Sequence, residues 1–235
     1  MRNDRTAVLF DMGNGAFAKL QLAIDEHALD AIVVSHMHAD HFFDLVPLRY
    51  ALKYGERRRD SRLPVWLPPG GRRALEALRT AVSQDAPDDF FETTFEISEY
   101  DSTQPLRVRD LTLRFCRTRH YVEAYAVRVE CGNGSFTYSA DTAPCGALLQ
   151  LARGSSLFLC EAALGLSSEE GERGHSSARE AGEMAREARV GHLVLTHYPA
   201  RYPATALVAA AQDVFAGRVS AADDGLEFSV RSYAS

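Results

Sequence analysis

The sequence lacks the features that mark an exported or membrane-spanning protein. No segment approaches the ~18 apolar residues of a membrane helix, and the first apolar run, AVLF, is far shorter than the core of a signal peptide. The cysteines form no C-x-x-C pair and stand mostly in strand-like apolar runs. We therefore expect a cytoplasmic protein, without a membrane partner, whose cysteines are reduced and buried. These cysteines are Cys116, Cys131, Cys145 and Cys160.

The chain also lacks an excess of positive charge. It has 26 Lys and Arg against 32 Asp and Glu, a net charge of -6, which argues against general attraction to nucleic acid or anionic membranes. Basic residues are concentrated between Arg49 and Arg79, and the stretch SQDAPDDFFETTFEISEYD (83–101) carries acids but no Lys or Arg. A solvated helix face or loop is the usual interpretation of such runs and a binding patch is the alternative, so we assign neither run a firm role. Any basic binding surface must be local.

Internal repeats, low-complexity segments and long Pro/Gly/Ser linkers are absent as well. With 46% hydrophobic residues the chain can bury a substantial core. We therefore predict a single domain over residues 1–235.

Hydrophobic periodicity predicts strands early in the chain and regular alternation of helices and strands later. This order favours a layered α/β sandwich. We expect strands at 7–10, 31–34, 64–67, 93–98, 106–116, 124–131, 135–140, 157–161, 192–197 and 226–230, and helices at 16–24, 40–54, 71–82, 145–152, 177–188 and 204–215, with CGNGS (131–135) as a hairpin turn.

The segment SHMHADHFFD (35–44) directly follows one of these strands. His36 and His38 are two residues apart, so in extended chain their side chains leave on the same side and can bind one ion. Asp40 and His41 follow where the chain turns into a helix, and they suit a second ion. A single histidine here would favour a solvated loop, but three with an aspartate in six residues indicate a metal site.

Two ions need further ligands, and three residues stand at the ends of later strands. His120 follows LTLRFCRTR, Asp141 follows FTYSA and His197 follows HLVLT. Ligands are commonly placed at such strand ends in open sheets. The alternative for Asp141 is that it caps the helix predicted at 145–152.

The segments SHMHADH, SADT, GHSSAREAGEMA and LVLTHY resemble the metallo-beta-lactamase superfamily, in particular its ribonuclease Z-like and phosphodiesterase branch. The resemblance covers about residues 8–200. It implies a four-layered αβ/βα sandwich with two divalent metal ions, usually Zn²⁺ and in some members Mn²⁺ or Fe²⁺. It also implies the ligands: His36, His38 and His120 for the first ion, Asp40, His41 and His197 for the second, and Asp141 between them.

Other residues carry further expectations. Asp40 can orient the attacking water or take its proton, and the resemblance implies that His175 contacts the phosphate and protonates the leaving oxygen. The alternative for His175 is an exposed histidine before the helix of SSAREAGEMAREA, where Ser176 or Ser177 can act as the cap. Glu161 is either the hydrogen-bond partner of a histidine ligand or a surface carboxylate, and Asp11 could partner a ligand in the same way. We interpret His27 and His192 as structural.

Members of the branch that process transfer RNA carry a long RNA-binding arm between the positions matching His120 and Asp141. Only twenty residues separate these two positions here. We therefore favour a small or cyclic phosphodiester as substrate over RNA, although a ribonuclease Z-like endonuclease stays an alternative. Hydrolysis of a lactone or thioester and a non-catalytic metal-binding module are two others. Relatives commonly form homodimers, which we expect here too.

One further feature departs from the family pattern. Relatives usually have additional strands before the segment matching AVLFDMG, whereas six residues precede Ala7 here. We therefore expect the first sheet to lack one or more N-terminal strands, which would leave a strand edge exposed.

Overall fold

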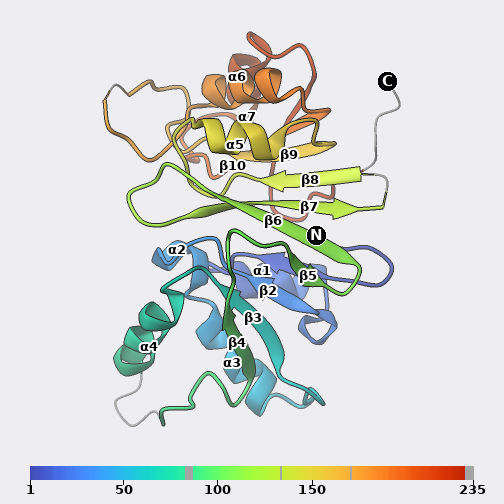
Figure 1. Ribbon diagram of the computed structural model, residues 1–235, viewed down its shortest axis with the longest axis vertical. Coiled ribbons are helices and arrows are strands. Elements are labelled where there is room, and N and C mark those ends of the chain that lie inside the picture. Colours follow the sequence, from blue (N-terminus) through green and yellow to red (C-terminus); the bar gives the residue numbers. More distant parts are fainter. Residues whose placement is uncertain (83–86, 133, 170, 231–235) are drawn as a thin grey trace. The chain divides into compact units, whose positions relative to one another are not determined.

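The computed structural model describes residues 1–82, 87–132, 134–169 and 171–230 (Figure 1). These residues form two compact units: unit 1 comprises Met1–Asp101 and Val108–Asp110, and unit 2 comprises Ser102–Arg107 and the residues from Leu111 onward. Each unit has its own sheet and its own apolar core. That residues 1–235 form one domain stays a prediction.

Unit 1 is built on a four-stranded parallel sheet in the order β1-β2-β3-β4. Helices connect successive strands, as parallel pairing requires. The strands are β1 (Val8–Phe10), β2 (Ala31–Val33), β3 (Leu63–Leu67) and β4 (Phe95–Glu99), and the helices are α1 (Ala16–Ala23), η1 (Glu26–Ala28), α2 (Ala39–Phe42), α3 (Leu45–Tyr54) and α4 (Gly71–Val82).

The core of unit 1 explains why these segments fold as they do. The β2 strand is buried along its whole length, whereas β3 alternates buried and half-buried residues. On α3 the buried leucines Leu45, Leu48 and Leu52 recur with helical spacing, so this face packs against the sheet. Among the residues described, those before Val8 contribute a single antiparallel bridge, Arg2 with Ala7, so β1 forms an edge of the sheet.

Unit 2 contains a seven-stranded mixed sheet in the order β11-β10-β9-β8-β7-β6-β5. The pairs from β8 to β11 are parallel, and β6, β7 and β8 are antiparallel. The strands are β5 (Leu106–Val108), β6 (Leu111–Arg117), β7 (Tyr125–Cys131), β8 (Gly134–Tyr138), β9 (Leu157–Glu161), β10 (His192–Thr196) and β11 (Arg218–Ala221), and the helices are α5 (Gly146–Ala152), α6 (Ala178–Ala188) and α7 (Ala204–Gln212).

The three helices of unit 2 share one apolar cluster with the central strands. Leu148 of α5, Met184 of α6 and Leu207 of α7 are buried in it together with Phe158 and Leu193. Ser177 caps α6 and forms a capping box with Glu180, as the sequence predicts. In the part of the chain that the structure describes, no helix is both long enough and apolar enough to cross a bilayer.

Three predicted elements were wrong in detail. The helix expected over residues 40–54 is broken into α2 and α3, because Pro47 has no N–H to donate to Phe43, whose carbonyl accepts from Val46 instead. The strand expected over 106–116 is two strands, separated by a turn in which Arg109 has φ 51°. The last strand is β11, and residues 226–230 form none; Leu226 is exposed and has no sheet neighbour to cover it.

Two smaller predictions can also be compared with the structure. The predicted hairpin joins β7 to β8, but its turn residue 133 lies outside the described residues. None of the four cysteines forms a disulfide. Only Cys160 is fully buried and the other three are partly exposed, so the predicted burial was wrong for those three. Burial nevertheless raises the pKa of Cys116 to about 12 and that of Cys160 well above its usual range, so both thiols are chemically inert near neutral pH.

Candidate metal centre

The histidine motif of unit 1 begins where β2 ends. Because β1 and β2 are parallel, their carboxyl ends meet at one edge of the sheet, which brings Asp11 next to Ser35 and His36. Asp11 has φ 59°, a left-handed conformation that a residue other than glycine rarely adopts. Such strained residues gather at functional sites, where surrounding contacts hold them in place.

Asp11 organises the histidines through hydrogen bonds. Its carboxylate accepts from the Ser35 amide at 2.6 Å, from the Ser35 hydroxyl at 2.8 Å and from His41 Nδ1 at 2.7 Å. Burial alone would raise the pKa of Asp11, but the His41 hydrogen bond and charge outweigh it and lower the pKa. Asp11 is therefore an anion that holds His41 with its proton on Nδ1 and a lone pair on Nε2.

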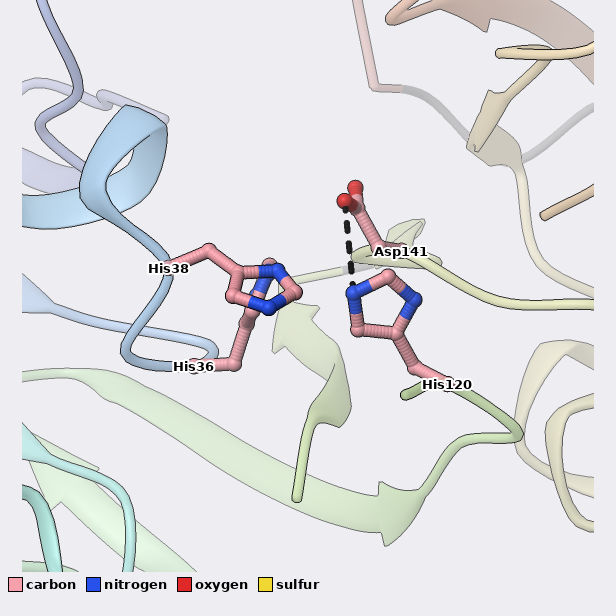
Figure 2. A group of neighbouring side chains, drawn as sticks. All are labelled: His36, His38, His120 and Asp141. Carbon is pink, nitrogen blue, oxygen red and sulfur yellow. Dashed lines mark hydrogen bonds and ion pairs between the residues drawn. The ribbon is translucent and has the colours of Figure 1, made fainter. Parts of the chain in front are cut away.

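His36 is held in the same tautomer by way of Ser35. The Ser35 hydroxyl donates to Asp11, so it accepts from His36 Nδ1, 3.0 Å away, and the lone pair of His36 lies on Nε2. His36 Nε2 lies 3.2 Å from His38 Nδ1 (Figure 2). Two nitrogens at zinc-ligand distance from one tetrahedral ion are about 3.3 Å apart, so this spacing fits a shared ion.

The second half of the motif follows at the start of α2. The Oδ2 atom of Asp40 lies 3.7 Å from His41 Nε2, and the rings of His36 and His41 are 3.9 Å apart between centroids. Unit 1 thus gathers all four of its predicted ligands. Asp44 lies apart from them, since its carboxylate accepts from the Phe17 amide at 2.9 Å.

Gly13 permits this arrangement. A Cβ atom on Gly13 would lie 1.6 Å from the carbonyl oxygen of Asp40, so no larger residue fits without moving the backbone. The neighbouring Met12 amide donates to the His41 carbonyl at 2.7 Å and ties the same two segments together. Gly13 therefore allows the backbone after Asp11 to approach the histidine motif closely.

In unit 2 the predicted residues also collect at one sheet edge. Asp141 follows β8, Glu161 ends β9 and His197 follows β10, and these three strands are parallel. Two antiparallel pairings relate β6 to β8, so β6 runs in the same direction and delivers His120 to that edge. His197 has φ 54° and Ala140, directly before Asp141, has φ 52°, so the chain turns sharply at both positions.

Asp141 lies between two histidines. Its Oδ2 is 3.8 Å from His120 Nε2 (Figure 2). Its Oδ1 is 3.5 Å from His197 Nδ1. Both distances exceed a hydrogen bond but fit ligand atoms that share an ion. The Nδ1 atom of His120 donates to the Gly174 carbonyl at 2.8 Å, which puts the lone pair of His120 on Nε2, the nitrogen nearer Asp141. Asp141 does not cap α5, because Cys145 occupies the cap position.

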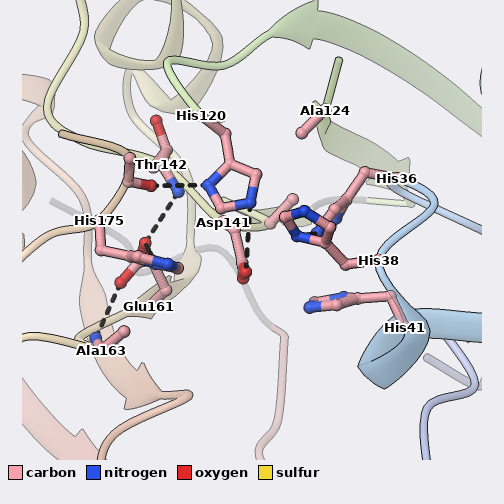
Figure 3. Close-up of polar contacts among 12 residues, drawn as sticks. His36, His38, His41, His120, Ala124, Asp141, Thr142, Glu161, Ala163 and His175 are labelled. Atoms are coloured by element: carbon pink, nitrogen blue, oxygen red, sulfur yellow. Dashed lines mark hydrogen bonds and ion pairs between the residues drawn. The ribbon is translucent and has the colours of Figure 1, made fainter. Parts of the chain in front are cut away.

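Glu161 is fully buried and carries four hydrogen bonds (Figure 3). Its Oε1 accepts from the Thr142 amide at 2.8 Å and from His175 Nδ1 at 2.9 Å, and its Oε2 accepts from the amides of Ala163 at 2.8 Å and Ser176 at 3.2 Å. The surface alternative is wrong. Glu161 does pair with a histidine, but that histidine is His175 and not one of the predicted metal ligands, so the prediction that it partners a ligand is not confirmed.

His175 is half-buried beside the predicted ligands of unit 2. Its ring centroid lies 4.9 Å from that of His120 and 5.9 Å from that of His197, and its ligand atoms lie within 4.8 Å of those of Asp141 and Glu161. The Glu161 hydrogen bond raises the pKa of His175 above its usual value, against the opposing effect of desolvation. The alternative of an exposed loop histidine is therefore wrong.

Sequence reasoning missed the residues that hold these groups through backbone atoms or small side chains. Ser35 links Asp11 to His36, Gly174 accepts from His120, and Ser176 donates its hydroxyl to the Thr142 carbonyl at 2.7 Å. The sequence feature that could have indicated them is their position, because each is the direct neighbour of a predicted ligand or of His175. His192 is structural as predicted; it is buried in β10 with Nε2 2.9 Å from the Ser220 hydroxyl.

Each unit therefore presents a donor set that suits divalent metal ions. The donors are imidazoles and carboxylates without a thiolate, which fits zinc, manganese and iron. Hydrogen bonds fix the lone pairs of His36, His41 and His120 on Nε2. Such partners are typical of metal-binding histidines, because they orient the ring and increase its basicity.

The family model of the beta-lactamase superfamily domain matches residues 6–198. The probable metallo-hydrolase YhfI of Bacillus subtilis is 29% identical over 221 residues, which cover 93% of this chain and 86% of YhfI. Its crystal structure has a TM-score of 0.84, at 26% identity, and covers 96% of this chain and 88% of that one.

Two further relatives extend the comparison. Ribonuclease Z of Methanothermobacter thermautotrophicus is 28% identical over 272 residues, with 96% and 88% of the two chains covered. A diphosphatase from the PhnP family shares the fold, with a TM-score of 0.70, 20% identity, and 99% and 84% of the two chains covered. This chain therefore belongs to the metallo-beta-lactamase superfamily, as a metallo-hydrolase related to ribonuclease Z.

Proposed function

We propose that this protein is a binuclear metal-dependent phosphodiesterase that acts on small or cyclic phosphodiesters. Residues from both units would hold the same pair of divalent ions: His36, His38 and His120 the first, Asp40, His41 and His197 the second, and Asp141 both. The fixed tautomers of three of these histidines and the position of Asp141 between His120 and His197 support this assignment.

When bound, the two ions would supply a nucleophilic water at neutral pH and neutralise charge on a phosphoryl oxygen. The protein's own residues would hold the ions and orient the water. The Asp40 side chain is 60% exposed, so substrate and water can reach its carboxylate, which would orient the water or take its proton. The fixed rings of His36 and His41 keep the donor atoms in place before an ion arrives.

The single observation that carries the phosphodiesterase proposal is the contact between Glu161 and His175. A buried carboxylate at 2.9 Å holds His175 Nδ1 and raises the pKa of the ring, so more of it is protonated at neutral pH. An alkoxide is a poor leaving group and needs a proton, which His175 can donate from Nε2. Hydrolysis of a thioester, whose thiolate leaving group is much less basic, has less need of such an acid. The relationship to ribonuclease Z, named for cleavage of a phosphodiester, points the same way.

Substrate size follows from the segment between His120 and Asp141. That segment forms β7, the β7–β8 hairpin and β8, and contains no helix or long excursion among the residues described. With an overall charge of -6, we favour a small substrate over RNA. The homodimer and the cytoplasmic location stay predictions, the former to be checked by sedimentation equilibrium.

Metal analysis tests the ligand assignment. We expect two equivalents of zinc, manganese or iron in the wild type, and a lower metal content in both His36→Ala, from unit 1, and His120→Ala, from unit 2. The matched control His27→Ala should keep the full content, because His27 contacts Asp25 and the Arg57 carbonyl instead. Full metal content in His120→Ala would refute the shared assignment.

The general acid is tested by two phosphodiesters, one with a p-nitrophenolate and one with an alkoxide leaving group. Protonation by a positioned acid contributes roughly 10²–10⁴-fold, so His175→Ala should lose about that factor on the alkoxide substrate, less on the p-nitrophenyl substrate, and keep its metal. If wild type cleaved esters or lactones but no phosphodiester, the proposal would be wrong. Turnover of no substrate with two metals bound would favour the binding module.

A further inference from the structure

Unit 1 contains a cavity of about 350 Å³ that the proposed reaction does not use. It is lined by the end of α3, the loop before β3 and the residues just before β4. Its charged lining comprises four cations and one carboxylate. The lining residues are Leu52, Lys53, Arg58, Arg59, Asp60, Ser61, Arg62, Thr93 and Thr94.

This cavity lies at the opposite end of the sheet from the histidine motif. The motif follows the carboxyl end of β2, whereas Arg62 directly precedes the first residue of the parallel neighbour β3 (Figure 1). The length of β3, at about 3.3 Å per residue, separates the two ends by roughly 16 Å. A ligand of this cavity therefore does not contact the motif.

Three of the four cations donate hydrogen bonds to neighbouring groups of unit 1. Arg59 Nη1 donates to the His27 carbonyl at 2.8 Å, Arg62 Nη1 donates to the Glu92 carbonyl at 3.4 Å, and Lys53 Nζ donates to the Thr93 hydroxyl at 3.2 Å. These three hydrogen-bond partners are uncharged, although the carboxylate of Asp30 also acts on the charge of Arg59. Burial lowers the pKa of Arg59 against the opposing effect of the Asp30 charge.

Thr94 belongs to the lining and carries a polar group that has no partner in the described part of the chain. The residue is only 7% exposed, its amide donates to the Phe91 carbonyl, and its carbonyl accepts from the Leu63 amide. Its hydroxyl oxygen is buried and has no hydrogen-bond partner among the described residues. A buried hydroxyl without a partner costs stability unless a ligand satisfies it.

We propose that this cavity is a second binding site, for the phosphate group of a small phosphomonoester. Arginine guanidinium groups match the geometry of phosphate oxygens, lysine adds a point charge, and the Thr94 hydroxyl donates to one oxygen. The excess of cations favours a dianion over a singly charged carboxylate. The cavity volume leaves room for a small group attached to the phosphate, and Leu52 provides an apolar wall for it.

The test is a titration of the full-length, zinc-loaded protein followed by backbone amide NMR. Inorganic phosphate, a nucleoside monophosphate and the matching nucleoside are added to about 20 mM, above the millimolar Kd of a small anion, with chloride at equal ionic strength as the salt control. We expect saturable shifts of the amides of residues 58–62, 93 and 94 with both phosphates and none with the nucleoside or chloride.

Variants separate a phosphate site from a structural role. Arg58→Gln combined with Arg62→Gln should weaken phosphate binding at least tenfold, while Arg73→Gln, an exposed arginine of α4 outside the cavity, should leave it unchanged. Thr94→Val should weaken binding about tenfold but leave the phosphate-free protein equally or more stable, because it removes a buried hydroxyl without a partner.

Three results would overturn the proposal. One is the absence of shifts in residues 58–62, 93 and 94, including the case where only the histidine motif responds to phosphate. Another is unchanged binding in Thr94→Val together with a loss of stability, which would make the hydroxyl a structural group. The third is a response of this cavity to an oligonucleotide but to neither phosphate nor the nucleoside monophosphate, which would identify an RNA-binding surface instead.

Discussion

Replacing Glu161 by glutamine is the most informative single change outside the proposed ligands. The carboxylate of Glu161 faces four donors, two at each oxygen: the Thr142 amide and His175 at Oε1, and the amides of Ala163 and Ser176 at Oε2. Only a group that accepts on both sides satisfies all four. Glutamine has the same shape but carries two N–H donors on one side, so one pair of donors must face another donor.

The expected loss of stability follows from the number of hydrogen bonds that Glu161→Gln would break. If the glutamine amide group turns toward Oε1, His175 can switch tautomer and accept from it, but the Thr142 amide loses its partner. If it turns toward Oε2, two backbone amides lose theirs. A hydrogen bond to a charged group contributes about 1.5–3 kcal/mol, so Glu161→Gln should lower the free energy of unfolding by about 2–4 kcal/mol. In a chain of this size the corresponding fall in Tm is roughly 5–15 °C.

The assay combines denaturant unfolding in the presence of a chelator with amide hydrogen exchange. Chelation removes any contribution from bound metal, and exchange of the amides of Thr142, Ala163 and Ser176 reports on the site itself. Glu130→Gln is the matched control, because Glu130 is half-exposed and pairs with Arg128 at the surface, where such pairs contribute about 0–1 kcal/mol. The free energy of unfolding of Glu161→Gln could instead lie within about 0.5 kcal/mol of the wild-type value, with unchanged amide exchange. That result would show that the four donors do not require a side chain that accepts on both sides.

Two further changes test other parts of the site and fold. Gly13→Ala places a Cβ atom 1.6 Å from the Asp40 carbonyl, so we expect a loss of stability of about 1–3 kcal/mol and lower metal affinity; unchanged zinc affinity by competition with a chromophoric chelator would contradict this. Desolvation in β10, helped by Arg218, lowers the pKa of His192 to about 4. The neutral form is therefore the one that stabilises the fold, and this stability is present above about pH 6.5 and lost as the pH falls toward 4. His192→Gln should reduce the change in the free energy of unfolding between about pH 6.5 and pH 4. An unchanged pH dependence in this variant would contradict the conclusion that His192 causes it.

Most elements could be predicted because their signals are local. Both boundaries of β9 and the first residue of α4 agree with the predicted ranges, since a short apolar run ending in Glu161 defines the strand and amphipathic spacing defines the helix. The break between α2 and α3 at Phe43 and Asp44 was harder to predict from the sequence. It depends on Pro47, whose missing N–H affects the carbonyl of Phe43, four residues earlier. Strand β11 was missed because it has one buried apolar residue, Val219, and depends on pairing with β10.

The candidate site could be predicted as far as residue types at strand ends determine it. His120, Asp141 and His197 share an edge because the directions of β6, β8 and β10 agree, a relation that the order of strands along the chain only suggests. The hydrogen-bond partners could not be assigned in the same way. Whether Glu161 faces a histidine or solvent depends on burial, and no pattern of spacing distinguishes a buried glutamate at a strand end from an exposed one.

Asp11 and Glu161 have the same local chemistry in the two units but different consequences. Each follows or ends a parallel strand and accepts hydrogen bonds from backbone N–H and from a histidine Nδ1. The distance from the carboxylate oxygen to Nδ1 is 2.7 Å for Asp11 and His41 and 2.9 Å for Glu161 and His175. A carboxylate in this position makes the opposite ring nitrogen more basic, whichever group that nitrogen meets. For His41 the partner would be a metal ion, which competes with a proton, and for His175 it would be a substrate oxygen, to which a proton is delivered. In the proposed reaction the same arrangement would strengthen a metal ligand in one unit and maintain an acid in the other. Asp11→Glu should therefore impair metal binding, and Glu161→Asp should impair protonation of the leaving group.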